Sequence, residues 1–441
     1  MFVFMRRRKG VSAMLCRSTE WGTSVAFVAV SCSCVLGMWT CVAAASDTRS
    51  WTPLFNGRNL DGWGNPYDWG EARVDDGQIV LQAEQKFFLV TAKRYRDFLF
   101  EGEVKMPDAQ SNSGFMFRCH QEHNKVYGYQ AEVDPSERRW SGGLYDEGRR
   151  GWLNPRNNDG DSVKAFVEST KGAFRLDDWN RYRIHCIGPS IRIYVNGILT
   201  TDYVDATDRD GYIAIQHHGE AGKMYRFRNL RLRELPAPAA LREAHNGLPL
   251  VFFEDFESGA DRWTQTDPNA WKLIDQDGNH AYSQYQQSKY EPPVRSPLNI
   301  ARIKNLKVSD FVVQAKIEQT GREYGHRDMC VFFGYQDSSH FYYTHIASAA
   351  DDAAHSIHIV NGAPRVSIVL ERTRGVDWGT GYHDVRVVRN VSTGSIEVFF
   401  DDMSKPVMRA VDRTFGAGGI GFGTFDDTGN VDDVIIWGRK P

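Results

Sequence analysis

The chain has 441 residues, of which 53 are Lys or Arg and 56 are Asp or Glu, so its formal net charge is −3. Beyond residue 45 the chain contains no block of basic residues, which argues against nucleic acid or an anionic membrane surface as a partner. Hydrophobic residues make up 41% and aromatic residues 12%, alongside 40 Gly. These proportions are those of a globular protein and favour β-structure over helix.

The N-terminal stretch has the three parts of a secretory signal. Residues 6–9 are basic, residues 25–42 are apolar and uncharged, and small residues follow up to Ala45. The pattern predicts a signal peptide over residues 1–45 and export to the periplasm or the cell exterior. An uncleaved membrane anchor is the alternative. Five of the 53 basic and one of the 56 acidic residues lie there, which leaves the mature chain a net charge of −7.

A linker at residues 236–249, with three Pro and one Gly, separates two strand-rich halves at 51–235 and 250–438. Both halves contain a hairpin with alternating apolar residues, RYRIHCIGPSIRIYVNG and DVRVVRNVSTGSIEVFFDD, and a Gly-led strand follows each. No helical segment longer than two turns stands out. The sequence therefore predicts an all-β fold of two consecutive concanavalin-like or jelly-roll β-sandwiches, which resemble divergent copies of one another.

The first half carries polar residues inside strand-like segments. Gln130, Glu132 and Asp134 alternate along one strand, so their side chains share a face. Burial of unpaired polar groups costs several kcal/mol, roughly, so this face is either exposed to solvent or the floor of a cleft. Asn112 and Arg118 on the preceding segment, with aromatic residues nearby, favour the cleft.

Two further segments supply candidate site residues. The glycine-rich segment SGGLYDEGRRGWLNP adds Tyr145, Asp146, Glu147, Arg149 and Trp152. In AIQHHGE, Gln216 and His218 share one strand face. A single His is more often structural than catalytic, yet imidazole is the natural proton carrier near neutral pH.

These motifs resemble the 3-keto-disaccharide hydrolase family of bacterial jelly-roll proteins. The matching segments are LFNGRNLDGW, NSGFMFR, GYQAEVD, SGGLYDEGRRGW, DDWNRYRIHCIG, IRIYVNG, GYIAIQHHG and FRNLRLREL, which together cover residues 51–235 in order. One departure is Gln130, where many members carry Glu. If that Glu is their base, the base of this chain has moved to Glu132 or activity is lost.

The resemblance implies cleavage of a glycoside already oxidised at C3, with loss of the C2 proton, elimination at C1 and addition of water. It implies a base at Glu132 or His218, an enolate-stabilising cation at Arg118, and an orienting or acidic role for Asp134. The residues expected to bind the sugar are Asn112, Gln130, Tyr145, Asp146, Glu147, Arg149 and Trp152. No metal is assigned to this site.

Two other functions fit the first half. Glu132 to Glu137 spells E-x-D-x-x-E, the signature of retaining β-glucanases, whose two carboxyl groups must flank the scissile bond. Pro135 is expected to end the strand and turn Glu137 out into the loop. The second alternative is a carbohydrate-binding module without activity.

Nothing in the second half approaches a catalytic set. Gly416 to Gly421 spells G-x-G-x-x-G, but a strand and not a helix follows, which excludes a dinucleotide site. Two acidic pairs are expected on adjacent strands, where their oxygens would suit structural calcium, with solvated charges as the alternative. These pairs are Glu254 with Asp255 and Asp432 with Asp433. We predict an accessory role for this half.

Overall fold

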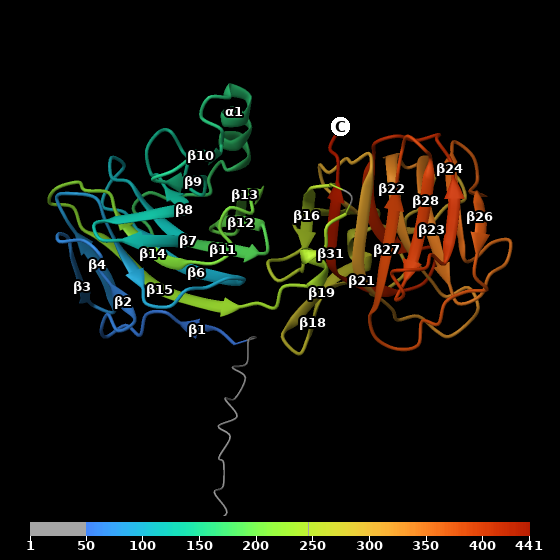
Figure 1. Ribbon diagram of the computed structural model, residues 1–441, viewed down its shortest axis with the longest axis horizontal. Helices are drawn as coiled ribbons and strands as arrows, with labels where there is room; N and C mark the ends of the chain where they lie inside the picture. The colour runs from blue at the N-terminus through green and yellow to red at the C-terminus, as the bar shows by residue number, and fades with distance from the viewer. Residues whose placement is uncertain (1–49, 246) are drawn as a thin grey trace, which may run out of the picture. The chain divides into compact units, whose positions relative to one another are not determined.

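The structure is a computed structural model that describes residues 50–245 and 247–441. It contains four antiparallel sheets, and Figure 1 shows them as two sandwiches along the chain. The predicted all-β fold of paired sandwiches is thereby confirmed. The predicted signal peptide at 1–45 lies outside the described residues. In the described part, no helix combines the length and apolar character that crossing a membrane requires.

The first sandwich consists of two sheets packed through a hydrophobic core. The sheet on one side contains, in spatial order, β13 (Ile198–Val204), β12 (Ser190–Val195), β11 (Asn180–Ile187), β6 (Phe98–Lys105), β15 (Tyr225–Glu234), β4 (Gln78–Gln82) and β3 (Glu71–Asp75), with β1 (Thr52–Pro53) paired to β15. The other sheet, here called the site sheet, contains β10 (Gly151–Asn154), β9 (Leu144–Glu147), β8 (Lys125–Val133), β7 (Ser113–Glu122), β14 (Tyr212–His217), β5 (Phe87–Thr91) and β2 (Trp63–Gly64).

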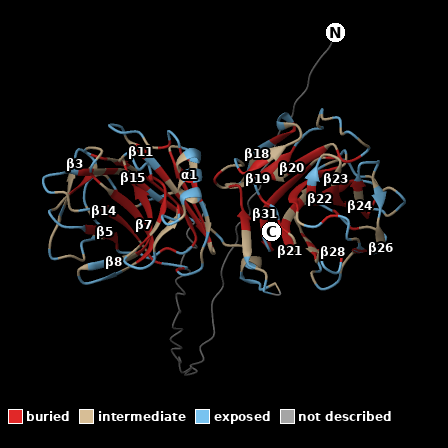
Figure 2. Ribbon diagram, turned by 90° about the horizontal axis from the view of Figure 1, so that it is seen from above, coloured by how far each residue is buried: buried red, intermediate tan, exposed pale blue. Residues whose placement is uncertain are grey.

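Alternation along the strands decides which side chains enter this core. On β12, Ile191, Ile193 and Val195 are fully buried in it, as the period of two predicts. On the site sheet, Tyr129 and Ala131 of β8 face the same core. Figure 2 shows the strands as predominantly buried. The intervening residues of β8 therefore point to the opposite face of the site sheet, away from the core.

One helix departs from the sequence expectation. α1 spans Gly160–Ser169, and its N-cap Asp159 accepts a hydrogen bond from the backbone N–H of Ser162 at 3.0 Å. Phe166 is its buried side chain. A helix with a single buried residue has too weak an apolar period to stand out in a sequence, although the Asp cap was a usable signal.

The second sandwich has the same two-layer design. One sheet contains β18 (Trp271–Gln276), β19 (Asn279–Gln284), β31 (Gly429–Gly438), β21 (Phe311–Gln319), β27 (His383–Arg389), β28 (Ser395–Phe400), β29 (Met408–Val411) and β26 (Val369–Arg372), with β16 (Leu250–Glu254) paired to β31. The other contains β17 (Trp263–Gln265), β20 (Asn299–Ile303), β30 (Gly419–Thr424), β22 (Asp328–Asp337), β23 (His340–Ala347), β24 (Ser356–Asn361) and β25 (Val366–Ser367). The G-x-G-x-x-G run leads into strand β30, so no helix follows it. Short 3-10 turns lie at η1 (Ala239–Arg242) and η2 (Pro268–Ala270).

The acidic pairs expected to bind calcium lie on neighbouring strands, because Glu254 of β16 is opposite Val434 of β31. Glu254 and Asp255 are nevertheless held by arginines. Arg192 contacts Glu254 at 2.6 Å and Asp255 at 2.9 Å, and Arg262 contacts Glu254 at 3.0 Å. Guanidinium groups therefore supply the positive charge that calcium was expected to supply at Glu254 and Asp255.

Candidate active site

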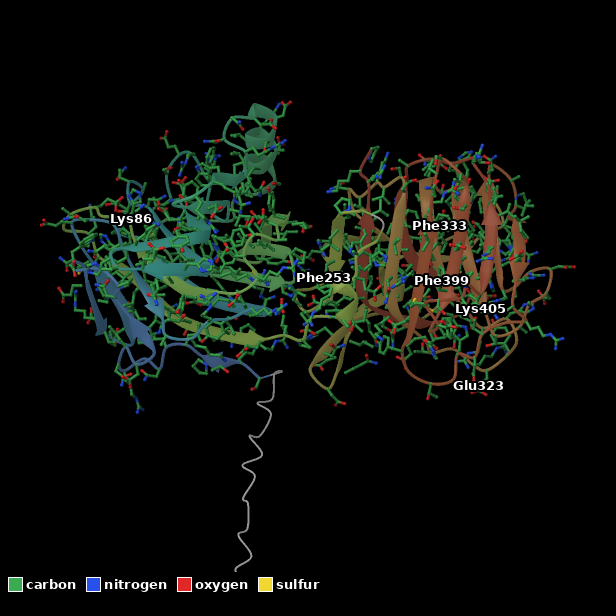
Figure 3. The ribbon with its side chains drawn as sticks, viewed as in Figure 1. Lys86, Phe253, Glu323, Phe333, Phe399 and Lys405 are labelled. Atoms are coloured by element: carbon green, nitrogen blue, oxygen red, sulfur yellow. The ribbon has the colours of Figure 1, made fainter. Side chains whose placement is uncertain are left out.

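A cavity of about 410 Å³ opens on the face of the site sheet that points away from the core. Eight of the eleven residues predicted from the sequence line it: Asn112, Gln130, Glu132, Asp134, Tyr145, Glu147, Trp152 and His218. The other lining residues are Lys86, Gln110, Ser111, Ser136, Arg138 and Gln216. Lys86 is labelled in Figure 3, where the strands of the site sheet lie close to it.

Strand β8 forms the floor of the cavity. Gln130 and Glu132 point into it because they alternate with the core residues of the strand. Gly114 lies opposite Glu132 on β7, and a Cβ atom at Gly114 would lie only 2.3 Å from Cδ of Gln130. The glycine in NSGF thus leaves the space that the Gln130 side chain occupies.

The Glu132 carboxylate is buried at this floor, with a side chain only 5% exposed. Asn112 donates to its Oε1 at 2.7 Å, and Gln130 donates to its Oε2 at 2.9 Å. Burial raises the pKa of Glu132 above the usual carboxyl value, because desolvation outweighs these hydrogen bonds. A carboxylate with a raised pKa is a stronger base, and it is fixed in position by amide donors.

Arg138 lines the cavity, although the sequence did not single it out. Its Nε donates to Asp134 at 2.7 Å, and its Nη2 donates to Glu132 at 3.3 Å. Its guanidinium also lies over the rings of Trp140 and Trp152, at 4.6 and 5.0 Å from their centroids. Charged residues after a strand-ending proline are common in solvated loops. The one sequence signal for Arg138 was its spacing of four residues from Asp134.

Aromatic rings form one wall of the cavity. The ring of Trp152 on β10 meets the ring of Trp140 edge-on, with 4.6 Å between the ring centroids. The centroid of Tyr145 on β9 lies 5.0 Å from that of Trp152. Trp140 is buried, whereas Tyr145 and Trp152 are half-buried and line the cavity. Rings held in this way offer a sugar an apolar surface that loses little entropy on binding.

Charged and amide groups surround the rest of the cavity. Lys86 forms an ion pair with Glu147 at 2.5 Å, and His218 bonds Glu220 through Nδ1 at 3.0 Å. Gln216 is 1% exposed. Its Oε1 has no hydrogen-bond partner, nor has Oε1 of the buried Gln130. Buried acceptors without donors are costly, and both of these side chains line the cavity.

Arg118, which was expected to stabilise the enolate, lies elsewhere in the first sandwich. Arg118 is fully buried and does not line the cavity. Its guanidinium donates to the carbonyl oxygens of Arg96 at 2.7 Å and Gly188 at 2.6 Å, and to Asp97 at 3.2 Å. The cause is a β-bulge between Phe117 and His120, where Arg118 has a φ of 45°. A bulge interrupts the alternation of side chains and re-aims them, which the sequence period alone did not predict.

Asp146 and Arg149 also lie outside the cavity. Asp146 is fully buried, accepts a hydrogen bond from Arg149 at 2.8 Å and forms an ion pair with Arg150. Arg149 forms a second ion pair with Asp208. On strand β9, Tyr145 and Glu147 point to the cavity, so Asp146 between them points to the other face. These residues form a structural ion cluster rather than a sugar contact.

The third carboxyl of the E-x-D-x-x-E motif does not join the other two. Glu137 is exposed and absent from the lining of the cavity, whereas Glu132 and Asp134 both line it. The retaining β-glucanase alternative required the complete set, and the geometry gives it no support.

The polar cavity of the first sandwich has aromatic rings in its wall. Residues 50–233, which form the first sandwich, match the family model of the 3-keto-alpha-glucoside-1,2-lyase-like domain. The match agrees with the family resemblance of the sequence motifs. None of the curated proteins matches the chain.

The solved structures that match this chain have low identity. A protein of Parabacteroides distasonis ATCC 8503 designated a glycosyl hydrolase is 19% identical, with a TM-score of 0.32, over 42% of this chain and 94% of that one. The carbohydrate-binding module CBM66 of Bacillus subtilis is 14% identical, with a TM-score of 0.30, over 40% and 95%. A galectin-like protein of Bacillus subtilis is 11% identical, with a TM-score of 0.31, over 44% and 98%. Nothing about activity follows from these likenesses.

Proposed function

We propose that the cavity binds a 3-keto-glycoside and cleaves its glycosidic bond by removing the proton at C2. The observation that carries this proposal is the buried Glu132 carboxylate, with the Arg138 guanidinium 3.3 Å from it on the same cavity. Deprotonation next to a ketone needs a base and a cation side by side, because negative charge develops on the ketone oxygen as the proton leaves. The family of the domain supports this choice of substrate.

The first step breaks the C2–H bond, which the C3 ketone acidifies. Glu132 takes the proton, the electron pair of that bond forms a C2=C3 double bond, and the C3 oxygen becomes an enolate. Arg138 donates hydrogen bonds to this oxygen and offsets its charge. Asp134 accepts from Arg138 at 2.7 Å and so orients the guanidinium.

The second step breaks the C1–O bond. The C3=O bond re-forms, a C1=C2 double bond forms, and the departing oxygen takes a proton from His218, which lines the cavity. Water then adds across the new double bond: its oxygen bonds to C1, its proton restores His218, and Glu132, after exchange with solvent, returns a proton to C2. The sum is hydrolysis. Gln130 and Gln216 accept hydrogen bonds from sugar hydroxyls with their unpartnered oxygens.

The test is to incubate the purified chain with a 3-keto-disaccharide in D₂O and to follow it by NMR. Deuterium incorporation at C2, together with release of the C1 substituent, is the expected result. Absence of both from a sample that binds the sugar would contradict the proposal. Release without any C2 exchange in the recovered product would contradict the elimination route.

A second candidate function is glycan binding without cleavage, which the two unpartnered amide oxygens favour. Whichever function holds, replacing Gln216 by Leu is expected to weaken sugar binding about 2- to 13-fold, the effect of one neutral hydrogen bond. Isothermal titration calorimetry measures this. Gln121→Leu on an exposed position of β7 is the matched control and should bind as the unaltered chain does.

The pH profile of kcat/KM should reflect the raised pKa of Glu132. The base acts only when deprotonated, so activity should rise with pH through a value above the usual carboxyl range. The positive charge of Arg138 lowers this pKa, and Arg138→Gln should therefore move the acidic limb to higher pH. A limb that stays in place in the variant would show that Glu132 is not the group observed.

We further place this reaction outside the cytoplasm, on the strength of the signal-like residues 1–45. Cell fractionation with an antibody against the sandwiches tests this placement. Recovery of the chain in the cytoplasmic fraction would contradict it.

A further inference from the structure

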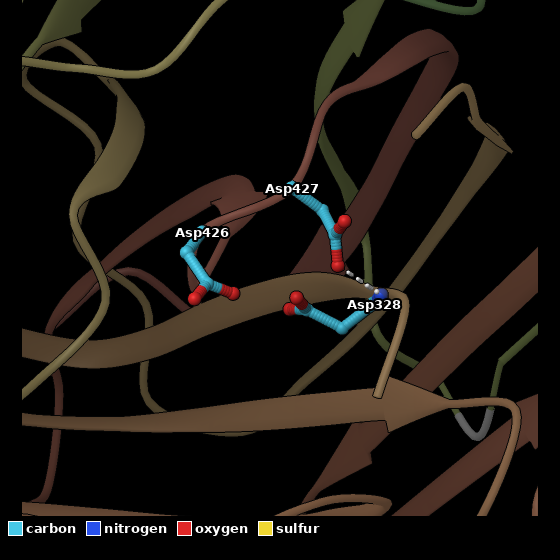
Figure 4. A group of neighbouring side chains, drawn as sticks. All are labelled: Asp328, Asp426 and Asp427. Carbon is cyan, nitrogen blue, oxygen red and sulfur yellow. Dashed lines mark hydrogen bonds between the residues drawn. The ribbon is translucent and has the colours of Figure 1, made fainter. Parts of the chain in front are cut away.

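Three carboxylates meet in the second sandwich, apart from the sugar cavity. Asp328 is the first residue of β22, and Asp426 and Asp427 lie in the loop between β30 and β31. One carboxylate oxygen from each lies within 4.8 Å of the others. Figure 4 shows the Asp426 and Asp328 carboxylates pointing toward one another. Asp328 and Asp427 are buried and Asp426 is exposed, so the group reaches solvent on one side.

The neighbours of this group are neutral hydrogen-bond donors. The Tyr324 hydroxyl and the backbone N–H of Asp328 donate to Asp427 Oδ2, both at 2.9 Å, and the backbone N–H of Phe425 donates to Asp328 Oδ2 at 3.0 Å. Among the described residues, one basic side chain approaches these three carboxylates: Nε2 of His345 lies 3.9 Å from Asp328. At 3.9 Å this contact is longer than a hydrogen bond. The donors position the carboxylates and leave their charge uncompensated.

An unpartnered oxygen points independently to a missing ligand. Asp328 is 0% exposed, and its Oδ1 has no hydrogen-bond partner. A buried carboxylate oxygen without a donor or a cation is strongly unfavourable.

We propose that Asp328, Asp426 and Asp427 bind a calcium ion that ties the start of β22 to the β30–β31 loop. Carboxylate oxygens are the ligands of hard divalent cations, and calcium accepts six to eight of them in irregular geometry. Magnesium requires near-ideal octahedral geometry, which a strand end and two consecutive loop residues do not readily provide. The exposed side at Asp426 leaves room for water ligands. This site is independent of the proposed sugar chemistry.

The test measures thermal unfolding of the full chain after removal of divalent ions with EGTA. Added CaCl₂ should raise the midpoint of the second sandwich by about 5–10 °C at concentrations a hundredfold above Kd. Asp426→Asn should abolish this rise without preventing folding, because residue 426 is exposed. Asp352→Asn, another exposed aspartate of the same sandwich, is the matched control and should retain the full rise.

Isothermal titration calorimetry with CaCl₂, MgCl₂ and ZnCl₂ identifies the ion. Binding of one calcium per chain, lost in Asp426→Asn and kept in Asp352→Asn, supports the proposal. Absence of calcium binding overturns it, and a proton on one of the carboxyl groups then takes the place of the metal ion. Equal calcium binding in both variants also overturns it. Binding of zinc alone also overturns it, since that preference would indicate ligation by the nearby Cys330 thiol and His345.

Discussion

Replacement of Glu132 by Gln is expected to lower kcat for a 3-keto-glucoside by about 10²- to 10⁴-fold, the usual contribution of a general base. An amide of the same shape cannot accept the C2 proton. The variant should fold, because Asn112 can still donate to the amide oxygen. Gln130 can turn its side-chain amide over and accept from the new N–H group with its presently unpartnered Oε1. Steady-state kinetics and sugar binding by calorimetry together measure the effect.

Glu137→Gln is the matched control for this prediction. Glu137 lies five residues further along the chain, is exposed, and does not line the cavity. It should retain the activity of the unaltered chain. Full turnover in the Glu132 variant would contradict the assignment of the base. A loss of turnover in both variants would instead favour the glucanase motif, in which both carboxyl groups react.

The alternation of residues along β8 was readable from sequence, and the structure follows it. Gln130 and Glu132 needed only a regular strand to reach the same face, and the pairing of the strand with β7 is regular from Tyr129 to Val133. The paired sandwiches were predictable for the same reason, since their strands repeat the period of two. Local pattern is sufficient wherever the backbone keeps its regular geometry.

The errors lie where the backbone departs from that geometry or where partners are distant. Arg118 enters a bulge and finds carbonyl groups 22 and 70 residues away, which no local pattern reports. Arg138 reaches the cavity from a loop after Pro135, and whether its side chain enters the cavity depends on the path of that loop. The acidic group of Asp328 with Asp426 and Asp427 joins segments about a hundred residues apart. Loop closure and long-range pairing therefore set the limit of the sequence prediction.

Arg118→Met is expected to destabilise the first sandwich by about 3–5 kcal/mol, because it removes one partner of a buried ion pair. Arg118 is 0% exposed, and Asp97 is 9% exposed. Met fits the same volume and keeps the same backbone, but it cannot donate to the Arg96 and Gly188 carbonyl oxygens or to Asp97. Chemical denaturation of the first sandwich measures the loss. At temperatures where the variant remains folded, kcat should equal that of the unaltered chain.

Arg96→Met tests whether loss of a positive charge near Asp97 is by itself enough to destabilise the first sandwich. Arg96 lies 3.5 Å from the same Asp97, but its side chain is 55% exposed. Its loss should change the free energy of unfolding by about 0–1 kcal/mol, since water replaces the contact. Comparing the free energies of unfolding of the two variants separates the effect of burial from the effect of proximity to Asp97. A fall in kcat without a loss of stability in Arg118→Met would return Arg118 to the catalytic role, whereas the buried contacts of its guanidinium require the opposite result.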